Sequence, residues 1–473
     1  DRADLVLVAS IEDEARAQTL LETLEAKITE EKGATFADED MAGTRVRVGS
    51  NEGDEVLFHS IADGRLVMAT TRTRMQSALS LGDEAQSMAS TADYEAVIRK
   101  LPEAAITVYV DQRAMKEAAE RAAAADAEAG APETIQDERL RAATSALEDY
   151  QLASAVGVGI YWTDAGLRAD AYTKLAEGDR RGLAAMMTSS PSAIRTLPFQ
   201  PEGTLLYGAM NTIDADLMYD ELRRYAVEAT RIQMNVAGTA DSLQADSLVA
   251  NQLAAFQSET GIDVEADIVS WVGQEASLAI AGVDRTGFFP IPEIALTVAT
   301  RDPAKSRAFL TRVEDLVGQA AAQQASIPLE WRGEEYQGQT LRYAPTPMGE
   351  GLSLSYVVTD DFVLIGSSRG LLKRMLDARG GAQPALPSNP GFAEMTGFYP
   401  SEVNALGFVN VEQILTEVQE LMGTMGGMTG AAAADTSSAT YKVMQALKNA
   451  PRMGFYSDAD AEGAFGHFLL EVR

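Results

Sequence analysis

An internal repeat is the feature that most constrains the fold, because two stretches of the chain carry the same pattern in the same order. Leu5–Leu24 matches Ala295–Glu314, and each predicts an alternating strand, an acidic turn and an amphipathic helix. Gly64–Ala78 matches Asp361–Met375, where a strand ends in two hydroxyl residues followed by an arginine. We therefore expect the chain to fold as two related units.

Short polar residues mark the helix starts in both copies. Asp13 and Asp302 lie near the start of the first matched helix, and Thr71 and Ser368 precede the second. Their side-chain oxygens can accept hydrogen bonds from the free N–H groups of a first helical turn. Both copies then predict a strand, helical segments separated by a loop, and two closing strands: Val156–Leu175 and Arg452–Val472.

Only the second copy has a front piece, Leu197–Pro290, which predicts a strand, two helices, a short helix and another strand. Nothing similar precedes Leu5, so we expect the missing piece to lie upstream in a longer precursor. The predicted organisation is a first repeat over residues 1–176, a linker over 177–196 and a complete second repeat over 197–473.

The expected fold class is α+β, with an antiparallel sheet and helices packed on it in each copy. The strands tend to alternate apolar and polar residues. That pattern predicts sheets with one dry face against the core and one wet face toward solvent.

Composition excludes several classes of protein. Asp and Glu number 70 against 39 Lys and Arg, so the net charge of −31 argues against binding nucleic acid or anionic lipid. Cysteine is absent, which excludes disulfides and thiolate chemistry. No run approaches the roughly 20 apolar residues that a membrane-spanning helix requires.

Several of these segments together resemble the bacterial DUF3352 family of uncharacterised exported proteins. They are TLLYGAM, TGIDVEADIVSWVGQEASLAIAG, ALTVATRDPAKSRAFL, DDFVLIGSSRGLLKRML and FYPSEVNALGFVNVEQIL. The resemblance covers Leu197–Val472, and it covers Leu5–Leu175 as an incomplete copy. It implies a signal or membrane anchor upstream and an extracytoplasmic location, periplasmic or at the cell surface. It implies no known activity, cofactor or catalytic residue.

The sequence offers little catalytic chemistry. Its two histidines, His59 and His467, lie in alternating strands and are expected to be half-exposed strand residues. Asp458, Asp460 and Glu462 resemble the start of a calcium loop, but the twelfth position is Leu469 rather than glutamate, which favours a plain hairpin turn. We expect no catalytic residue, cofactor or metal ion.

A methionine-containing segment is the main candidate for an interaction. The residues are Leu421, Met422, Met425 and Met428, at the start of a glycine-rich stretch that predicts a flexible loop. Methionine adapts its shape to varied apolar partners, so this loop is a candidate contact with a protein partner.

The expected function is a non-enzymatic extracytoplasmic interaction or scaffold protein, for example an extrinsic subunit of a membrane-associated complex. One alternative is a carrier of a lipophilic small molecule, which requires an enclosed apolar cavity. The aromatic residues that could line it are Tyr207, Tyr219, Tyr225, Phe256, Trp271, Phe288 and Phe289. A carboxylate-based hydrolase, which requires two buried acids facing each other in a cleft, is the less favoured alternative.

Overall fold

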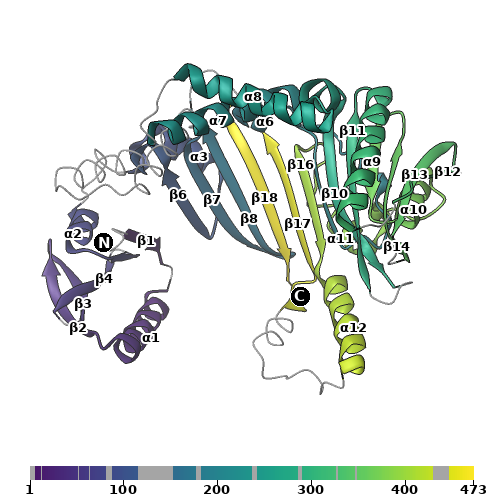
Figure 1. The fold of residues 1–473 in the computed structure, drawn as a ribbon. Coiled ribbons are helices and arrows are strands. Elements are labelled where there is room, and N and C mark those ends of the chain that lie inside the picture. The colour runs from purple at the N-terminus through teal and green to yellow at the C-terminus, as the bar shows by residue number, and fades with distance from the viewer. Residues whose placement is uncertain are drawn as a thin grey trace. The chain divides into compact units, whose positions relative to one another are not determined.

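The fold is taken from a computed structural model (Figure 1). It describes residues 6–11, 13–51, 53–62, 64–80, 88–115, 153–176, 183–236, 242–285, 290–325, 329–346, 349–429 and 447–472. The chain divides into two compact units, Asp1–Glu95 and Ala96–Arg473, and each is described by itself. No described helix is both long and apolar enough to cross a membrane.

The first unit is a five-stranded antiparallel sheet in the order β1-β5-β4-β3-β2. Asp13 caps the start of helix α1, where its carboxylate accepts the N–H of Arg16 at 3.0 Å, and Gly33 in the left-handed conformation caps its end. The core gathers Phe58 and Met75, both fully buried. The elements are β1 (Val6–Ser10), α1 (Glu14–Lys32), β2 (Thr35–Met41), β3 (Thr44–Asn51), β4 (Asp54–Ala62), β5 (Arg65–Ala69), α2 (Arg72–Ser80) and η1 (Met88–Ser90).

The second unit is built on one 13-stranded antiparallel sheet. Its order is β12-β13-β14-β15-β11-β10-β9-β16-β17-β18-β8-β7-β6. The first elements along the chain are α3 (Ala92–Lys100), β6 (Ile106–Asp111), β7 (Ala153–Thr163), β8 (Gly166–Leu175), α6 (Leu183–Met187), η2 (Leu197–Phe199), β9 (Leu206–Met210), α7 (Ala215–Val236), α8 (Ser242–Thr260), η3 (Val264–Val269) and β10 (Val272–Asp284).

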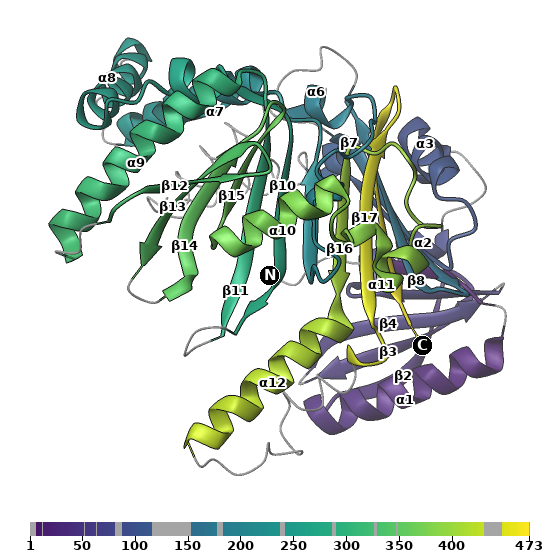
Figure 2. The same cartoon turned by 90° about the vertical axis from the view of Figure 1, so that its right-hand side faces the viewer.

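The remaining elements complete the sheet and its helices. They are β11 (Ile291–Thr300), α9 (Pro303–Ala325), β12 (Arg332–Tyr336), β13 (Gln339–Thr346), β14 (Gly349–Val358), β15 (Phe362–Gly366), α10 (Arg369–Gly380), η4 (Leu386–Ser388), α11 (Pro390–Glu394), β16 (Ala405–Asn410), α12 (Val411–Thr429), β17 (Arg452–Ala459) and β18 (Gly463–Glu471). Helices α10 and α11 pack on one sheet face, and Figure 2 shows them in front of the strands.

Strand order confirms the repeat. The order β11-β15-β14-β13-β12 reproduces β1-β5-β4-β3-β2, and β16-β17-β18 reproduces β6-β7-β8. Strands β9 and β10 of the second copy have no counterpart among the described residues of the first. One matched segment is shifted by a residue from the sequence alignment. Ala295 pairs with Gly366, and the equivalent pair in the first copy is Val6 with Ala69. Ala295 therefore corresponds to Val6 rather than to Leu5. The shift brings Asp13 into line with Asp302, and both cap the helix that follows.

The compact units do not coincide with the repeats. The last strands of the first copy belong to the large sheet, because β8 pairs with β18 from Gly166↔Glu471 to Lys174↔Gly463. The compact division therefore falls after Glu95, whereas the sequence pattern places the end of the first repeat at residue 176. The predicted linker and repeat limits stay predictions.

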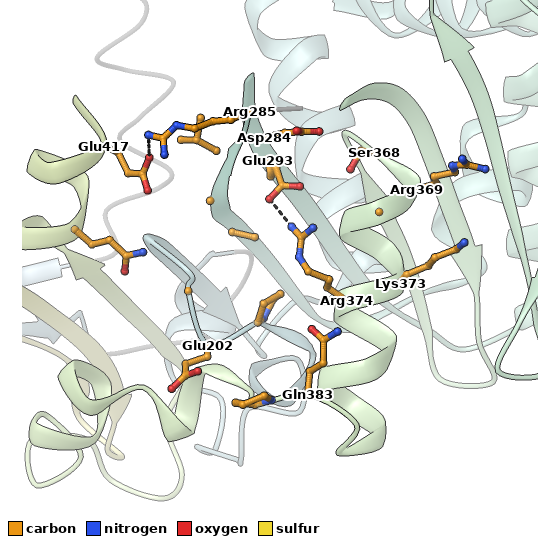
Figure 3. Close-up of a pocket in the computed structure, with 18 residues that line it drawn as sticks. Glu202, Asp284, Arg285, Glu293, Ser368, Arg369, Lys373, Arg374, Gln383 and Glu417 are labelled. Carbon is orange, nitrogen blue, oxygen red and sulfur yellow. Dashed lines mark hydrogen bonds and ion pairs between the residues drawn. The ribbon is translucent and has the colours of Figure 1, made fainter. Parts of the chain in front are cut away.

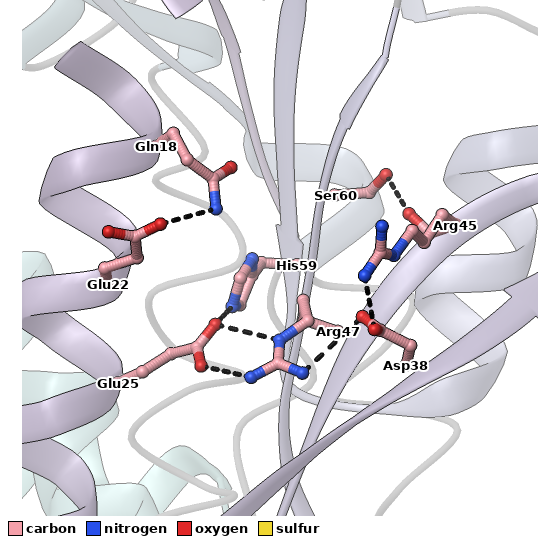
Figure 4. Close-up of polar contacts among 8 residues, drawn as sticks. All are labelled: Gln18, Glu22, Glu25, Asp38, Arg45, Arg47, His59 and Ser60. Atoms are coloured by element: carbon pink, nitrogen blue, oxygen red, sulfur yellow. Dashed lines mark hydrogen bonds and ion pairs between the residues drawn. The ribbon is translucent and has the colours of Figure 1, made fainter. Parts of the chain in front are cut away.

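A glutamate–arginine pair ties the long helix to the sheet in both copies. In the first, Arg47 Nη2 donates to Glu25 Oε2 at 2.6 Å, and His59 Nε2 lies 2.9 Å from Glu25 Oε1 (Figure 4). In the second, Arg342 Nη2 donates to Glu314 Oε2 at 2.5 Å. The Tyr356 hydroxyl donates to Glu314 Oε1 at 2.5 Å. Each copy thus satisfies a largely buried carboxylate with one charged and one further donor.

The third members of the two clusters occupy equivalent positions. Arg47 lies opposite His59 in the β3–β4 pairing, and Arg342 lies opposite Tyr356 in the β13–β14 pairing. Burial lowers the pKa of His59, although Glu25 opposes this effect. A neutral imidazole then donates to Glu25 as the tyrosine hydroxyl does to Glu314.

The other histidine joins the two copies. His467 on β18 lies 2.8 Å from Asp170 on β8, and its second nitrogen lies 3.7 Å from Asp458. Burial alone would lower the pKa of His467, but the hydrogen bond to Asp170 and the nearby negative charge of Asp458 outweigh it and raise the pKa above 6.5. The expectation of half-exposed histidines was wrong, because His59 is 2% and His467 9% exposed. Each histidine is buried beside a carboxylate from another element.

Removing the helix carboxylate should weaken each unit. Glu314→Gln is expected to lower the free energy of unfolding by about 1–3 kcal/mol, since Arg342 loses its charged partner in a largely buried site. Glu25→Gln should have the same sign. Chemical denaturation measures the change. The matched control is the exposed neighbour Asp315→Asn, which should stay within about 0.5 kcal/mol of the unchanged chain. Equal losses in control and test variants would contradict the assignment.

The two histidines should give opposite pH dependences. The raised pKa of His467 contributes stability that is full below its unfolded value of 6.5 and is lost as pH rises through the folded pKa. The lowered pKa of His59 contributes stability that is present above 6.5 and lost as pH falls through the folded pKa.

The measurement is the unfolding free energy at about pH 5.5 and about pH 8.5, on either side of the ordinary histidine pKa, with His467→Asn and His59→Asn beside the unchanged chain. The loss caused by His467→Asn should be larger at the lower pH, and the loss caused by His59→Asn should be larger at the higher pH. The same pH trend for both variants would refute the two assignments.

Candidate functional site

An open cleft of about 800 Å³ lies beside the start of helix α10 (Figure 3). Its charged lining comprises four acidic and four basic side chains, so neither sign is in excess. They are Glu202, Asp284, Glu293, Glu417, Arg285, Arg369, Lys373 and Arg374.

The basic side chains of the cleft have acidic partners. Arg374 pairs with Glu293, which is 6% exposed. Arg285 pairs with Glu417 on α12. Lys373 and Arg369 lie 2.5 and 3.6 Å from Glu334. An anionic ligand would have to displace these carboxylates.

The hydroxyl of the cleft, on Ser368, is also engaged. Ser368 Oγ accepts the N–H of Leu371 at 3.1 Å and caps α10. Among the charged lining residues, the buried acid Glu293 faces an arginine rather than a second acid. The cleft therefore gives no support to a carboxylate-based hydrolase, and its charged lining is not the enclosed apolar cavity that a lipophilic carrier requires.

The weak metal candidates lie around the β17–β18 turn. Asp460 Oδ1 accepts the N–H groups of Glu462 and Gly463 at 2.7 and 2.8 Å, and its Oδ2 lies 2.5 Å from Lys100 Nζ. Asp458 faces His467 instead. The described residues contain no group of three or more His, Asp or Glu side chains that could hold a metal ion. The carboxylate of Asp460 closes a turn.

The methionine segment is helical where it is described. Helix α12 runs from Val411 to Thr429, so the predicted loop over Gly423–Thr429 is wrong for the backbone of these residues. Leu421 is 36% exposed. Met422, Met425 and Met428 lie on the same helix, but their side chains fall outside the described residues, as does the rest of the predicted loop. Helix propagation from the well-formed first turns outweighs the cost of the glycines.

The aromatic residues of the front piece do not form one group. Tyr207 and Trp271 are buried at 1% and 5% exposure in two different core clusters. Tyr225 and Phe256 are exposed on α7 and α8. Phe288 and Phe289 lie outside the described residues. The described members therefore do not outline a single apolar cavity.

An apolar face of the large sheet is the feature that residue patterns did not predict. Directly opposed residues of antiparallel strands share a face, so the registers define rows of side chains across the sheet. Three such rows lie opposite the face covered by α10 and α11, and we call them the open face. Figure 1 looks onto this side, where β8, β18 and β17 lie in view without a helix in front.

The three rows contain no charged residue. The first is Leu296, Leu278, Gly208, Gly407, Phe455, Phe468, Ala169, Ile160 and Ile106. The second is Ile294, Ile280, Leu206, Val409, Met453, Leu470, Leu167 and Trp162. The third is Val298, Ala276, Met210, Ala405, Ser457, Gly466, Ala171, Val158 and Val108. With strands about 4.8 Å apart, the rows span roughly 40 Å.

Exposure distinguishes this face from a core. Leu278 is 51%, Phe455 41% and Trp162 75% exposed. Helix α9 covers one end of the open face, at strands β11 and β15. There Leu310 packs with Val363, Val298 and Ile365. The expectation of a polar outer face is wrong for these strands. In β10, the run Ala276–Ala281 places apolar residues on both faces of the sheet. That run was a sequence signal for the open face.

Two opposed glycines leave a gap in the side chains of the open face, and we call this gap the furrow. Gly208 on β9 lies directly opposite Gly407 on β16, between Leu278 on one side and Phe455 on the other. A Cβ added at Gly208 would meet no atom within 4 Å. At Gly407 an added Cβ would lie 3.5 Å from the Phe455 side chain, so the furrow is open over Gly208, where it can receive an apolar side chain of a partner.

Comparison with known proteins gives a family but no activity. No curated protein matches the chain. Two solved structures match, titled "Structure of crystal form I of TP0453" and "Structure of crystal form III of TP0453". The first is 11% identical over 59% of this chain and 79% of that one, with a TM-score of 0.25. The second is 12% identical over 60% and 81%, with a TM-score of 0.24. Likeness at these scores supports no argument.

A family model matches the chain in two overlapping regions, residues 1–289 and 249–424. Its description is "Protein of unknown function (DUF3352)". The two regions fit the tandem organisation that the strand orders show. The chain belongs to the DUF3352 family.

Proposed function

We propose that this protein is a non-enzymatic interaction or scaffold protein in an extracytoplasmic, membrane-associated complex, and that the open face contacts a protein partner. The observation that carries the proposal is an uncharged apolar face on a chain of net charge −31. Large exposed apolar patches on otherwise charged proteins mark interaction sites.

Energetics favour covering this face. Each square ångström of apolar surface removed from water contributes about 25 cal/mol. Leu278, Phe455 and Trp162 are far enough apart along the rows that one small molecule would not cover them all. Pockets for small ligands bury most of the ligand surface, whereas the open face is broad and unenclosed. These points favour a protein partner over a carried small molecule.

The proposed location outside the cytoplasm has two supports. The chain lacks cysteine, which suits many exported bacterial proteins, and the segments that resemble the DUF3352 family imply export. The acidic surface would keep the rest of the molecule soluble while the apolar face engages its partner.

Charge or bulk placed on the open face should break the complex. Leu278→Glu puts a carboxylate into the rows, and Gly208→Leu fills the furrow where an added Cβ has room. Both variants are expected to leave the thermal unfolding midpoint within about 3 °C of the unchanged chain. Native gel electrophoresis of mildly solubilised membranes should show the unchanged chain in a larger assembly and both variants outside it.

The matched control is Leu20→Glu, which changes a 65% exposed leucine on α1 and should leave the assembly intact. A chain that migrates as a monomer in native extracts would overturn the proposal. Native mass spectrometry of that monomer would then test the carrier alternative, which requires a bound lipophilic molecule that Leu278→Glu removes.

A further inference from the structure

The outer edges of the two sheets are of two kinds. Strands β2 and β12 are acidic edges that carry Asp38, Glu39, Asp40, Glu334 and Glu335. Strand β1 ends its sheet in the described part of the chain, yet Val6, Leu7 and Val8 are 41%, 52% and 56% exposed. Charged edges discourage the pairing of further strands, whereas an apolar edge is a template for it. Strand β1 therefore has the sequence of an interior strand.

The second copy shows what covers this edge. Strand β11, the counterpart of β1, pairs on its far side with β10 from Val272↔Thr300 to Asp284↔Ile291. Strand β10 is also the element that directly precedes β11 along the chain. In the described residues of the first copy, the same acceptor strand is present without the added one.

We propose that the edge of β1 binds an antiparallel strand of the β10 type, supplied by a segment of the same polypeptide that precedes Asp1. Main-chain hydrogen bonds would provide affinity, and alternating apolar side chains would fix the register. The inference does not depend on the open face, so the two can fail separately.

The ladder geometry fixes which groups meet the added strand. Ile11 donates its N–H to Gly64 on the β5 side at 2.8 Å. Successive residues of a strand point their main-chain groups to alternate sides, so those of Val8 point away from β5. Ala9 is the counterpart of Val298, which pairs with Ala276. The added strand should therefore place its Ala276 equivalent opposite Ala9.

The other apolar edge, taken within its own sheet, repeats the pattern. Strand β6 is the counterpart of β16, and β16 carries β9. The match is supported by equivalent caps: Asp111 accepts the N–H of Ala114, and Asn410 accepts that of Gln413. Ile106 on β6 is 55% exposed. Both edges that carry a front-piece strand in the second copy are thus uncovered acceptor edges among the described residues of the first copy.

The absence of native cysteine makes a cross-linking test specific. The probe is a synthetic peptide of residues 272–284 with cysteine in place of Ala276, mixed with the full chain carrying Ala9→Cys. Opposed residues outside the hydrogen-bonded pairs lie close enough for a disulfide. We expect this peptide to cross-link at least about tenfold more than a peptide with cysteine in place of Ser277, whose side chain points to the other face.

Val8→Pro supplies the matched control, since it removes an N–H directed to the edge and leaves the β1–β5 bonds intact. It should reduce cross-linking at least about tenfold, and Val8→Ala should not. The chain extended by its natural preceding residues should resist the peptide. The proposal would be overturned by equal yields from both peptides or by cross-linking that is insensitive to Val8→Pro. It would also be overturned by undiminished cross-linking of the extended chain, or by a disulfide between two Ala9→Cys chains in place of the peptide cross-link.

Discussion

Pairing between β8 and β18 is the contact on which the architecture of the larger unit depends. Each strand closes one copy of the repeat, and their register from Gly166↔Glu471 to Lys174↔Gly463 turns two sheets into one. His467 and Asp170 lie at this seam, where a buried histidine and carboxylate satisfy each other. A duplicated unit with only local contacts would form two separate sheets. Here the closing strands of the first copy belong to the sheet of the second.

Buried charges have partners in this protein, and exposed apolar side chains lie together in continuous surfaces. Where charges are buried, as at Glu25 and Glu314, they have charged partners and further donors. Where apolar side chains are exposed, as in the open face and along β1, they form continuous rows or edges rather than scattered points. Exposure of that kind is costly in water unless another surface covers it. The open face and the β1 edge therefore both indicate surfaces that are completed by further polypeptide.

Much of the fold could be predicted from residue patterns. The repeat, its helix caps and the order of strands and helices follow from local periodicity and short polar residues, as Asp13 and Asp302 show. The pairing of β8 with β18 joins residues far apart in the chain, so no local pattern contains it. The open face was missed because apolar runs such as Leu278–Ala281 look alike whether both faces are covered or only one. The burial of His59 was missed for a related reason, since its partner Glu25 lies on another element.

The glutamate–arginine pairs that tie the long helix to the sheet show which contacts are the same in the two copies. Carboxylate and guanidinium are the same in both copies, while the third position holds an imidazole in one and a phenol in the other. The two copies of the repeat thus share the charge pair and differ in the residue beside it. The third position therefore accommodates either aromatic ring, because each ring can donate one hydrogen bond to the carboxylate.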